Sequence, residues 1–260
     1  MLQNNYFRFK YMKQTNKVAQ ITVLFWIMKV IATTLGETLG DFFSMTAGFG
    51  YLVTLIAMLL FFIVALAVQL SVKKFIPVVY WLVIISTTTL GTEVSDFMDR
   101  TLHLGYTIGS VILFLCLIAT LIFWKVKFKT LEVFPIEKRN KEILYWCAIL
   151  FSNSLGTAFG DFLSDDLALT YLTGALITAL TIIVVILLHY FTRLNQVVLF
   201  WIAFVFTRPF GATFGDFLTK PVSKGGMDLG TLNASLTSIV LMAILVIFSY
   251  RKKSKEIRID

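Results

Sequence analysis

The sequence predicts an all-α polytopic membrane protein, with eight transmembrane helices arranged as four parallel helical-hairpin repeats of pseudo-fourfold, two-by-two symmetry. Two observations predict this fold class. The chain of 260 residues is 58% hydrophobic with a mean hydropathy of +0.83, and its apolar stretches are about twenty residues long, enough to cross a bilayer. One residue pattern also recurs in every second stretch, which indicates an internal repeat.

The apolar stretches define eight spans joined by short connections. We place the spans at residues 19–43, 50–71, 77–98, 104–124, 142–164, 170–190, 196–218 and 228–250. They form one transmembrane domain, 1–260, whose longest connection is the basic segment 125–141. The first span carries Lys29 and Glu37 and lacks a small-residue cleavage site, so we expect a retained helix rather than a signal peptide.

The odd-numbered spans repeat one motif: a Trp, a Gly ten residues later, and an Asp-Phe pair that begins at fifteen. The motif starts at Trp26, Trp81, Trp146 and Trp201. Because the offsets are 55, 65 and 55 residues, one shift of 120 residues maps the first half onto the second. This pattern predicts a hairpin duplicated twice, with repeats at about 19–74, 75–127, 140–193 and 194–250. Each repeat holds two spans, so all four hairpins point the same way.

Charge distinguishes the spans that should face inward from those that should face lipid. Even-numbered spans such as 50–71 and 104–124 contain no charged residue, which suits a lipid-facing ring. The odd-numbered spans carry the intramembrane charges and are expected to face the interior of the bundle.

Basic residues lie mainly at one end of the predicted bundle. Eighteen of them, including Arg8, Lys10 and Lys13, precede the first span or follow the even-numbered spans. The opposite side holds only Arg100, Lys220 and Lys224. This asymmetry predicts a bacterial inner-membrane protein with both termini in the cytoplasm. The net charge of +8 is explained by topology and by attraction to anionic lipid, so the bilayer is the expected partner and no nucleic-acid role is assigned. The sequence leaves open whether the bundle forms a homo-oligomer.

The segments TLGETLGDFF (34–43) and TRPFGATFGDFL (207–218), each with its preceding Trp, carry a family resemblance. They resemble bacterial membrane-anchored proteins built from four copies of a repeat of unknown function. The resemblance covers nearly the whole chain and implies the fold and the membrane location. It implies no activity, so function has to be inferred from the polar residues within the spans.

Two rings of polar residues are predicted to line a central pathway. Each motif Asp lies about 22 Å beyond its Trp, which places the four Asp residues in the outer third of the membrane core, around an external vestibule. Eight residues earlier, a second polar ring lies nearer the midplane. Glu37 and Glu93 add carboxylates close to the Asp ring. The predicted pathway residues are Asp41, Asp96, Asp161, Asp216, Glu37, Glu93, Thr33, Thr88, Asn153 and Arg208.

Structural interpretations of the same motifs remain open beside the functional ones. The four Trp residues are expected to be interfacial anchors, and Lys29 to extend towards the cytoplasmic interface. Pro209 with Gly211 predicts a kink or break in the seventh span. In the structural alternative, Asp161 and Asp216 pair with Arg208 or cap neighbouring helix ends, and Arg208 is then a counter-ion rather than a gate. Close helix packing explains the small-xxx-small glycines Gly36, Gly40, Gly91, Gly156, Gly160, Gly211 and Gly215.

Carboxylates and hydroxyls are hard oxygen ligands, and they suggest what passes through the bundle. We expect a transporter or channel for a small cation: a proton, an alkali ion or a hard divalent metal, whose identity the sequence does not give. The alternative is a non-transporting membrane scaffold or sensor with an ion-paired core. An enzyme is not expected, because the sequence has no nucleophile–histidine pair and no HExxH motif, and no cofactor is predicted.

Overall fold

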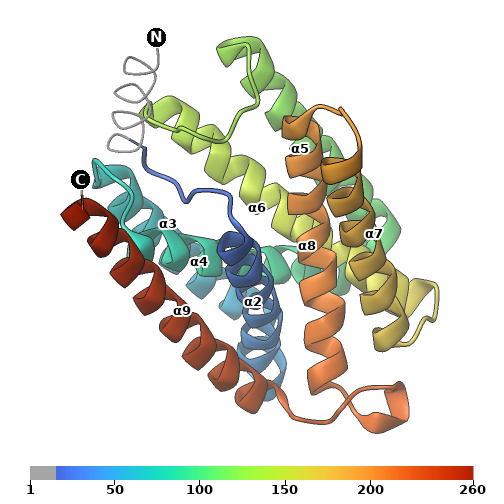
Figure 1. Cartoon of the computed structure of the whole chain (residues 1–260). Coiled ribbons are helices and arrows are strands. Elements are labelled where there is room, and N and C mark those ends of the chain that lie inside the picture. Colours follow the sequence, from blue (N-terminus) through green and yellow to red (C-terminus); the bar gives the residue numbers. More distant parts are fainter. Residues whose placement is uncertain (1–15, 260) are drawn as a thin grey trace.

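The protein is a bundle of helices (Figure 1). The computed structural model describes residues 16–259, and within this range the chain forms eight helices long and apolar enough to cross a membrane, and no strand. The predicted all-α fold in four repeats is therefore confirmed. Arg8, Lys10 and Lys13, which contributed to the topology prediction, lie outside the described residues.

Burial separates the helices into an inner and an outer set. The inner helices are α2 (Val23–Asp41), α4 (Pro77–Asp96), α6 (Arg139–Asp161) and α8 (Gln196–Thr219). The outer helices are α3 (Tyr51–Ser71), α5 (Tyr106–Phe128), α7 (Tyr171–Phe191) and α9 (Thr231–Ile259). Between 61% and 72% of the most apolar part of each inner span is buried, against 11–22% for the outer spans. The outer helices thus offer their apolar side chains to lipid, and the inner helices surround the axis of the bundle.

Helix packing closes the bundle into a ring. Each inner helix contacts the inner helices of the two adjacent repeats, and α8 returns to α2. Each outer helix packs mainly against the inner helix of the next repeat: α3 on α4, α5 on α6, α7 on α8, and α9 back on α2. The four hairpins therefore interlock around a pseudo-fourfold axis.

Glycines set the spacing of the inner ring. The Gly that follows each Trp by ten residues faces the next inner helix. It meets that helix at the residue seven positions after the Trp of that helix. A methyl group built there would lie within 2.3–3.0 Å of the neighbour at all four contacts, namely Gly36 with Thr88, Gly91 with Asn153, Gly156 with Arg208 and Gly211 with Thr33. Real side chains do not approach so closely, so only glycine lets the helices come together here.

The bundle has two distinct ends. We call the end where the inner helices begin the termini end, since the segment before α2 and the last turns of α9 lie there, and the other end the turn end (Figure 1). At the turn end, α2, α4 and α6 each pass, directly after the motif Asp, into a five-residue π-helical turn: η1 (Phe42–Thr46), η2 (Phe97–Thr101) and η3 (Phe162–Asp166). The fourth repeat differs, because α8 ends at Thr219 and leads through the 3₁₀ turn η4 (Val222–Lys224) to α9.

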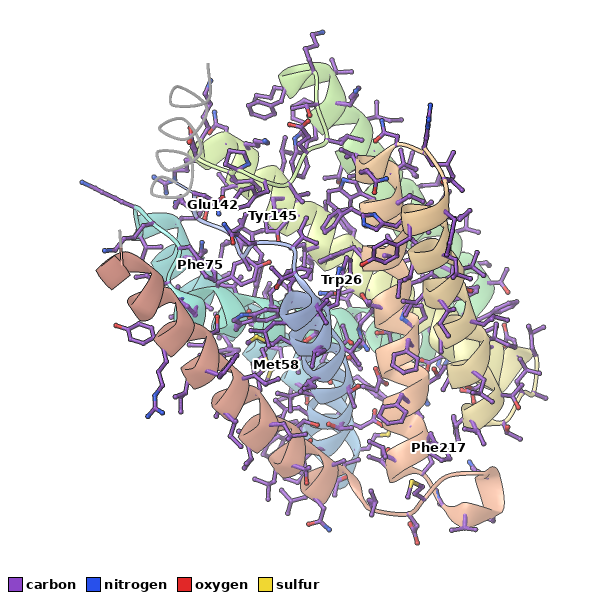
Figure 2. All side chains as sticks on the ribbon, in the orientation of Figure 1. Trp26, Met58, Phe75, Glu142, Tyr145 and Phe217 are labelled. Carbon is purple, nitrogen blue, oxygen red and sulfur yellow. The ribbon has the colours of Figure 1, made fainter. Side chains whose placement is uncertain are left out.

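Aromatic side chains close the termini end, and they correct one sequence prediction. Trp81, Trp146 and Trp201 are buried within the protein, so the interpretation of these three as interfacial anchors is wrong. They pack with Trp124 and the Tyr80–Tyr145 pair, whose hydroxyl oxygens are 2.6 Å apart. Figure 2 shows Tyr145 and Glu142 towards this end and Phe217 at the turn end. Aromatic burial within the bundle has outweighed the preference of Trp for the membrane surface.

The connection between α5 and α6 covers the same end. Trp201 Nε1 donates a hydrogen bond to the Leu131 carbonyl oxygen at 3.1 Å, and Ile136 is fully buried. Glu142 accepts hydrogen bonds from Lys17 Nζ at 2.5 Å and from Gln69 Nε2 at 2.9 Å. These contacts fasten the segment before α2 to the start of α6 and the end of α3.

Pro209 does not interrupt α8. The helix runs continuously from Gln196 to Thr219 with Pro209 inside it, so the predicted break is wrong. The side chain of Asn195 caps the start of this helix by accepting a hydrogen bond from Val197 N at 2.9 Å. Continuity matters for the site, because α8 carries Arg208 and Asp216 on a single uninterrupted helix.

We expect Gly211→Ala to lower the free energy of unfolding by about 1–3 kcal/mol, the usual range for overpacking. The added methyl group would lie 2.3 Å from Thr33 Oγ1 and 2.8 Å from the Thr33 carbonyl carbon, and backbone cannot move aside without shifting α2. Thermal unfolding of the purified protein in detergent measures the effect. Gly215→Ala is the control in the same helix, because its nearest neighbour would be Glu37 Cβ at 3.1 Å. Equal losses in the two variants would contradict this account of the ring.

Candidate cation site on the bundle axis

Polar side chains from the inner helices are stacked along the bundle axis. They form three layers, which lie progressively further from the termini end along each inner helix: one around Lys29, one around Arg208 and one formed by the motif Asp residues. All of these side chains are buried in the described structure. The polarity of the odd-numbered spans is thus turned away from lipid.

The first layer is built around Lys29, which sequence reasoning had placed at the membrane interface. Lys29 is fully buried instead, and its Nζ donates a hydrogen bond to Asn153 Oδ1 at 3.0 Å. Asn153 Nδ2 in turn donates to Thr87 Oγ1 at 3.1 Å. The ammonium also lies 4.2 Å from the centre of the Phe204 ring, a favourable cation–π position. Inward partners have thus replaced the expected extension to the interface.

The second layer is an ion pair in the middle of the bundle. Arg208 is fully buried and donates to Glu37 Oε2 at 2.9 Å, to Thr92 Oγ1 at 2.5 Å and to the Thr33 carbonyl oxygen at 3.3 Å. Its partner is therefore Glu37, and the alternative pairing with Asp161 or Asp216 is not found. A buried guanidinium needs such partners, because an unpaired charge in this environment is very costly.

Thr33 and Thr88, predicted to line the pathway, join the inner helices to one another. Thr33 Oγ1 lies 3.2 Å from the Thr207 carbonyl oxygen of α8, and Thr88 Oγ1 donates to the Ala32 carbonyl oxygen of α2 at 3.0 Å. Both hydroxyls also bond to carbonyls of their own helix. Their hydrogen bonds are therefore satisfied by backbone, and they hold the ring together.

The third layer is the ring of motif Asp residues, bridged by two basic residues at the turn end. Arg100 lies 3.2 Å from Asp96 and 3.8 Å from Asp161. Lys220 Nζ lies 2.6 Å from Asp41 and 3.2 Å from Asp216. Arg100 and Lys220 are related by the same shift of 120 residues as the two halves of the chain. The carboxylate ring therefore has twofold rather than fourfold symmetry.

The two bridging cations are the most accessible charges of this layer. The side chains of Arg100 and Lys220 are 32% and 22% exposed, while the ring carboxylates are almost completely buried. Burial acts to lower the pKa of Lys220, but the carboxylates of Asp216 and Asp41 outweigh it and raise that pKa above its usual value. Lys220 is therefore a charged ammonium at neutral pH, held beside the carboxylates.

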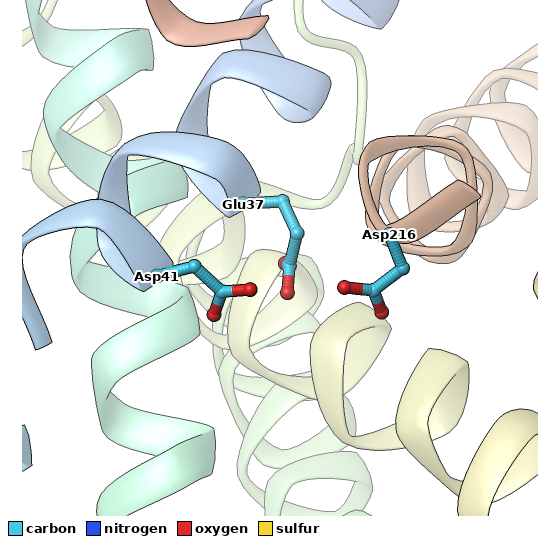
Figure 3. Close-up of side chains that lie close together, drawn as sticks. All are labelled: Glu37, Asp41 and Asp216. Atoms are coloured by element: carbon cyan, nitrogen blue, oxygen red, sulfur yellow. The ribbon is translucent and has the colours of Figure 1, made fainter. Parts of the chain in front are cut away.

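Three carboxylates converge where the second and third layers meet. One oxygen from each of Glu37, Asp41 and Asp216 lies within 4.8 Å of the others, and all three residues are buried. Figure 3 shows Glu37 and Asp41 extending from α2 towards Asp216 on α8. We call these three residues the acid cluster. The clustering brings together two predicted pathway residues from the first repeat and one from the fourth.

Glu93 stands beside the acid cluster without a partner. It is fully buried, and among the residues that the structure describes neither carboxylate oxygen has a hydrogen-bond partner and no basic side chain pairs with it. Its carboxyl group faces α2, since a Cβ built on Gly40 would lie 3.0 Å from Glu93 Oε1. Its electrostatic neighbours are Asp96, Asp41 and Glu37, all acidic.

Sequence reasoning missed the two bridging residues as members of the site. Arg100 and Lys220 had been counted only as charges at the outer end. Each stands four residues after a motif Asp, so the helical spacing that forms an i,i+4 ion pair was present in the sequence. Thr92, which shares the Arg208 guanidinium with Glu37, carried no comparable signal.

Comparison with known proteins identifies the repeat. The model of the family described as "Repeat of Unknown Function (DUF347)" matches residues 24–75, 79–130, 144–195 and 199–255. The chain belongs to this family. Each match covers one inner helix and the outer helix that follows it, so the unit of the family is the hairpin of this bundle. No curated protein and no solved structure matches the chain, and the function is therefore argued from the site.

We expect Arg208→Gln to destabilise the protein by about 3–5 kcal/mol, because it leaves the buried Glu37 carboxylate without its cation. The double variant Arg208→Gln with Glu37→Gln should recover part of this loss, since both charges are then removed. Thermal unfolding of the wild type, both single variants and the double variant forms a complete cycle. Additive losses would show that the two side chains do not act as a pair.

Proposed function

We propose that the protein transports a small cation across the membrane along the axis of the inner helices. The observation that carries this proposal is the acid cluster, in which three buried carboxylates converge on the axis beside the partly exposed Lys220. Carboxylate oxygens bind hard cations. Intramembrane carboxylates that face a bundle interior commonly mark ion pathways.

The filled axis favours a transporter over an open channel. The Arg208–Glu37 pair occupies the middle of the bundle, and the aromatic layer of Trp81, Trp146 and Trp201 closes the termini end. The acid cluster lies close to the turn end, where the accessible Arg100 and Lys220 stand. A cation entering from that end would reach the carboxylates first, and it could continue only after Arg208 released Glu37.

The distribution of basic residues indicates how the protein is oriented in the membrane. Most basic residues that the structure describes precede α2 or lie near or after the ends of the outer helices, at the termini end, so we assign that end to the cytoplasm of a bacterial inner membrane and the turn end to the outside. The acid cluster would then face the external medium.

A membrane scaffold or sensor is the second candidate. It is favoured by the pairing of Arg208, Arg100 and Lys220 with carboxylates, because such a network can specify the order of helices around a ring. The two candidates differ in one property: only a transporter loses flux when a cluster carboxylate is neutralised without loss of the fold.

Asp216→Asn should leave the protein folded and reduce cation flux by about tenfold or more, because one charged ligand of the acid cluster is lost. We would measure flux of H⁺, Na⁺, K⁺, Mg²⁺, Ca²⁺ and Mn²⁺ into proteoliposomes. Asp166→Asn is the matched control, since it removes an exposed charge at the same end, outside the acid cluster. Equal flux above background in the wild type and a well-folded Asp216→Asn variant would overturn the site assignment, and absence of flux in the wild type would support the scaffold instead.

A fusion to the C-terminus tests the orientation. Green fluorescent protein attached there should fluoresce, and alkaline phosphatase attached at the same point should be inactive, because both would remain in the cytoplasm. When each reporter is fused instead at the η4 turn between α8 and α9, green fluorescent protein should be dark and alkaline phosphatase should be active. Active phosphatase at the C-terminus would reverse the proposed orientation.

A further inference from the structure

We propose that the acid cluster binds one hard divalent cation, of the chemical class of Ca²⁺ and Mn²⁺, and that this ion displaces the ammonium of Lys220. The inference rests on the proposed function and specifies the substrate class of that site. Four observations support it: the spacing of the oxygens, the local charge, the orphaned carboxyl group of Glu93 and the placement of Lys220.

The spacing of the carboxylate oxygens fits a divalent ion. One oxygen from each of the three residues lies within 4.8 Å of the others. Ligand oxygens on opposite sides of Ca²⁺ are about 4.6–5.2 Å apart, and those around Mg²⁺ about 4.0–4.2 Å apart. Three ligand oxygens have at most one such opposite pair, so separations of up to 4.8 Å lie within the coordination sphere of a calcium-sized ion.

The charges around the cluster favour a divalent over a monovalent ion. With all three carboxyl groups ionised, Glu37, Asp41 and Asp216 contribute three negative charges, while Arg208 and Lys220 contribute two positive charges. One negative charge therefore remains uncompensated. A divalent cation in place of the ammonium brings the sum to zero, whereas a monovalent cation leaves it unchanged. Charge compensation matters greatly here, because the groups are buried away from water.

Glu93 gives an independent indication that the site takes a ligand. Buried polar side chains almost always have a partner, yet both oxygens of this fully buried carboxyl group lack one in the described part of the chain. The group faces α2 at Gly40, next to Asp41. It therefore places an unpartnered carboxyl group from α4 beside a cluster formed by α2 and α8.

Lys220 is placed so that it can leave without disturbing the helices. It follows the last residue of α8, its backbone is extended, and its side chain is 22% exposed. Its Nζ contacts two of the three cluster carboxylates, so it occupies the position of a bound cation. A flexible lysine stem can swing into the solvent at the turn end, which frees the carboxylates for an incoming ion.

The other half of the chain shows why one site is expected per protein. A shift of 120 residues relates Asp41 and Asp216 to Asp161 and Asp96, and Lys220 to Arg100. The position that corresponds to Glu37 is Thr157, so the third carboxylate is missing there. This half instead holds the Arg100 guanidinium between two carboxylates.

Binding can be measured without any transport. We would titrate the full chain in detergent micelles with CaCl₂, MnCl₂ and MgCl₂ at constant KCl and follow the heat by calorimetry. The wild type should bind about one divalent ion per chain. Asp216→Asn should weaken binding about tenfold or more, as the loss of a charged ligand does. Lys220→Met should strengthen it, because it removes the competing ammonium, and Asp166→Asn should leave it unchanged.

The Lys220→Met arm keeps the inference testable if Asp216→Asn fails to fold. A purely structural Lys220 would make this variant less stable with no gain in affinity, and that result would overturn the proposed displacement. Absence of divalent binding by the folded wild type would overturn the site. Divalent binding with the expected pattern but no flux in vesicles would support the site and refute transport. Monovalent flux without divalent binding would do the reverse.

Discussion

The close contact between neighbouring inner helices is the constraint on which the rest of the structure depends. Each inner helix contacts the next one closely because it has a glycine, without a side chain, at the point of contact. These glycines are Gly36, Gly91, Gly156 and Gly211. The ring that results surrounds the axis with protein on every side. A charge placed at mid-helix costs about 2.5–3.5 kcal/mol by insertion scales, and this enclosure is what allows Lys29 and Arg208 to be satisfied by side chains from other helices.

The arrangement of the helices is more symmetric than the arrangement of the charged side chains. The helices follow a fourfold repeat, and the glycine contacts keep it. The bridging residues Arg100 and Lys220 retain only the twofold relation between the two halves. In the described part of the chain the acid cluster occurs once, because the residues equivalent to Glu37 in the other repeats are not acidic. The features that suggest function are therefore those in which the copies differ, while the features that suggest the fold are those they share.

The fold was predictable from the sequence because its signals are local and repeated four times. Hydropathy located the spans, the recurring Trp, Gly and Asp indicated the repeats, and charge indicated which helices face inward. The pairing of charges was much less predictable, since it depends on the rotation and order of helices around the ring. Arg208 therefore pairs with Glu37 rather than with Asp161 or Asp216. Burial of Trp146 and Lys29 could not be inferred for the same reason. No sequence signal predicted the π-helical turns after the motif Asp residues.

The closed ring also has a consequence for how such a chain diversifies. In a complex of two identical half-length subunits, any change at the position of Glu37 would appear twice, once beside each bridging cation. Joining the halves in one polypeptide removes that coupling, so that Thr157 and Glu37 can occupy equivalent places with different side chains. Gene duplication followed by fusion thus supplies an enclosed scaffold in which one copy of a site can acquire a ligand-binding residue while its counterpart continues to hold the helices together.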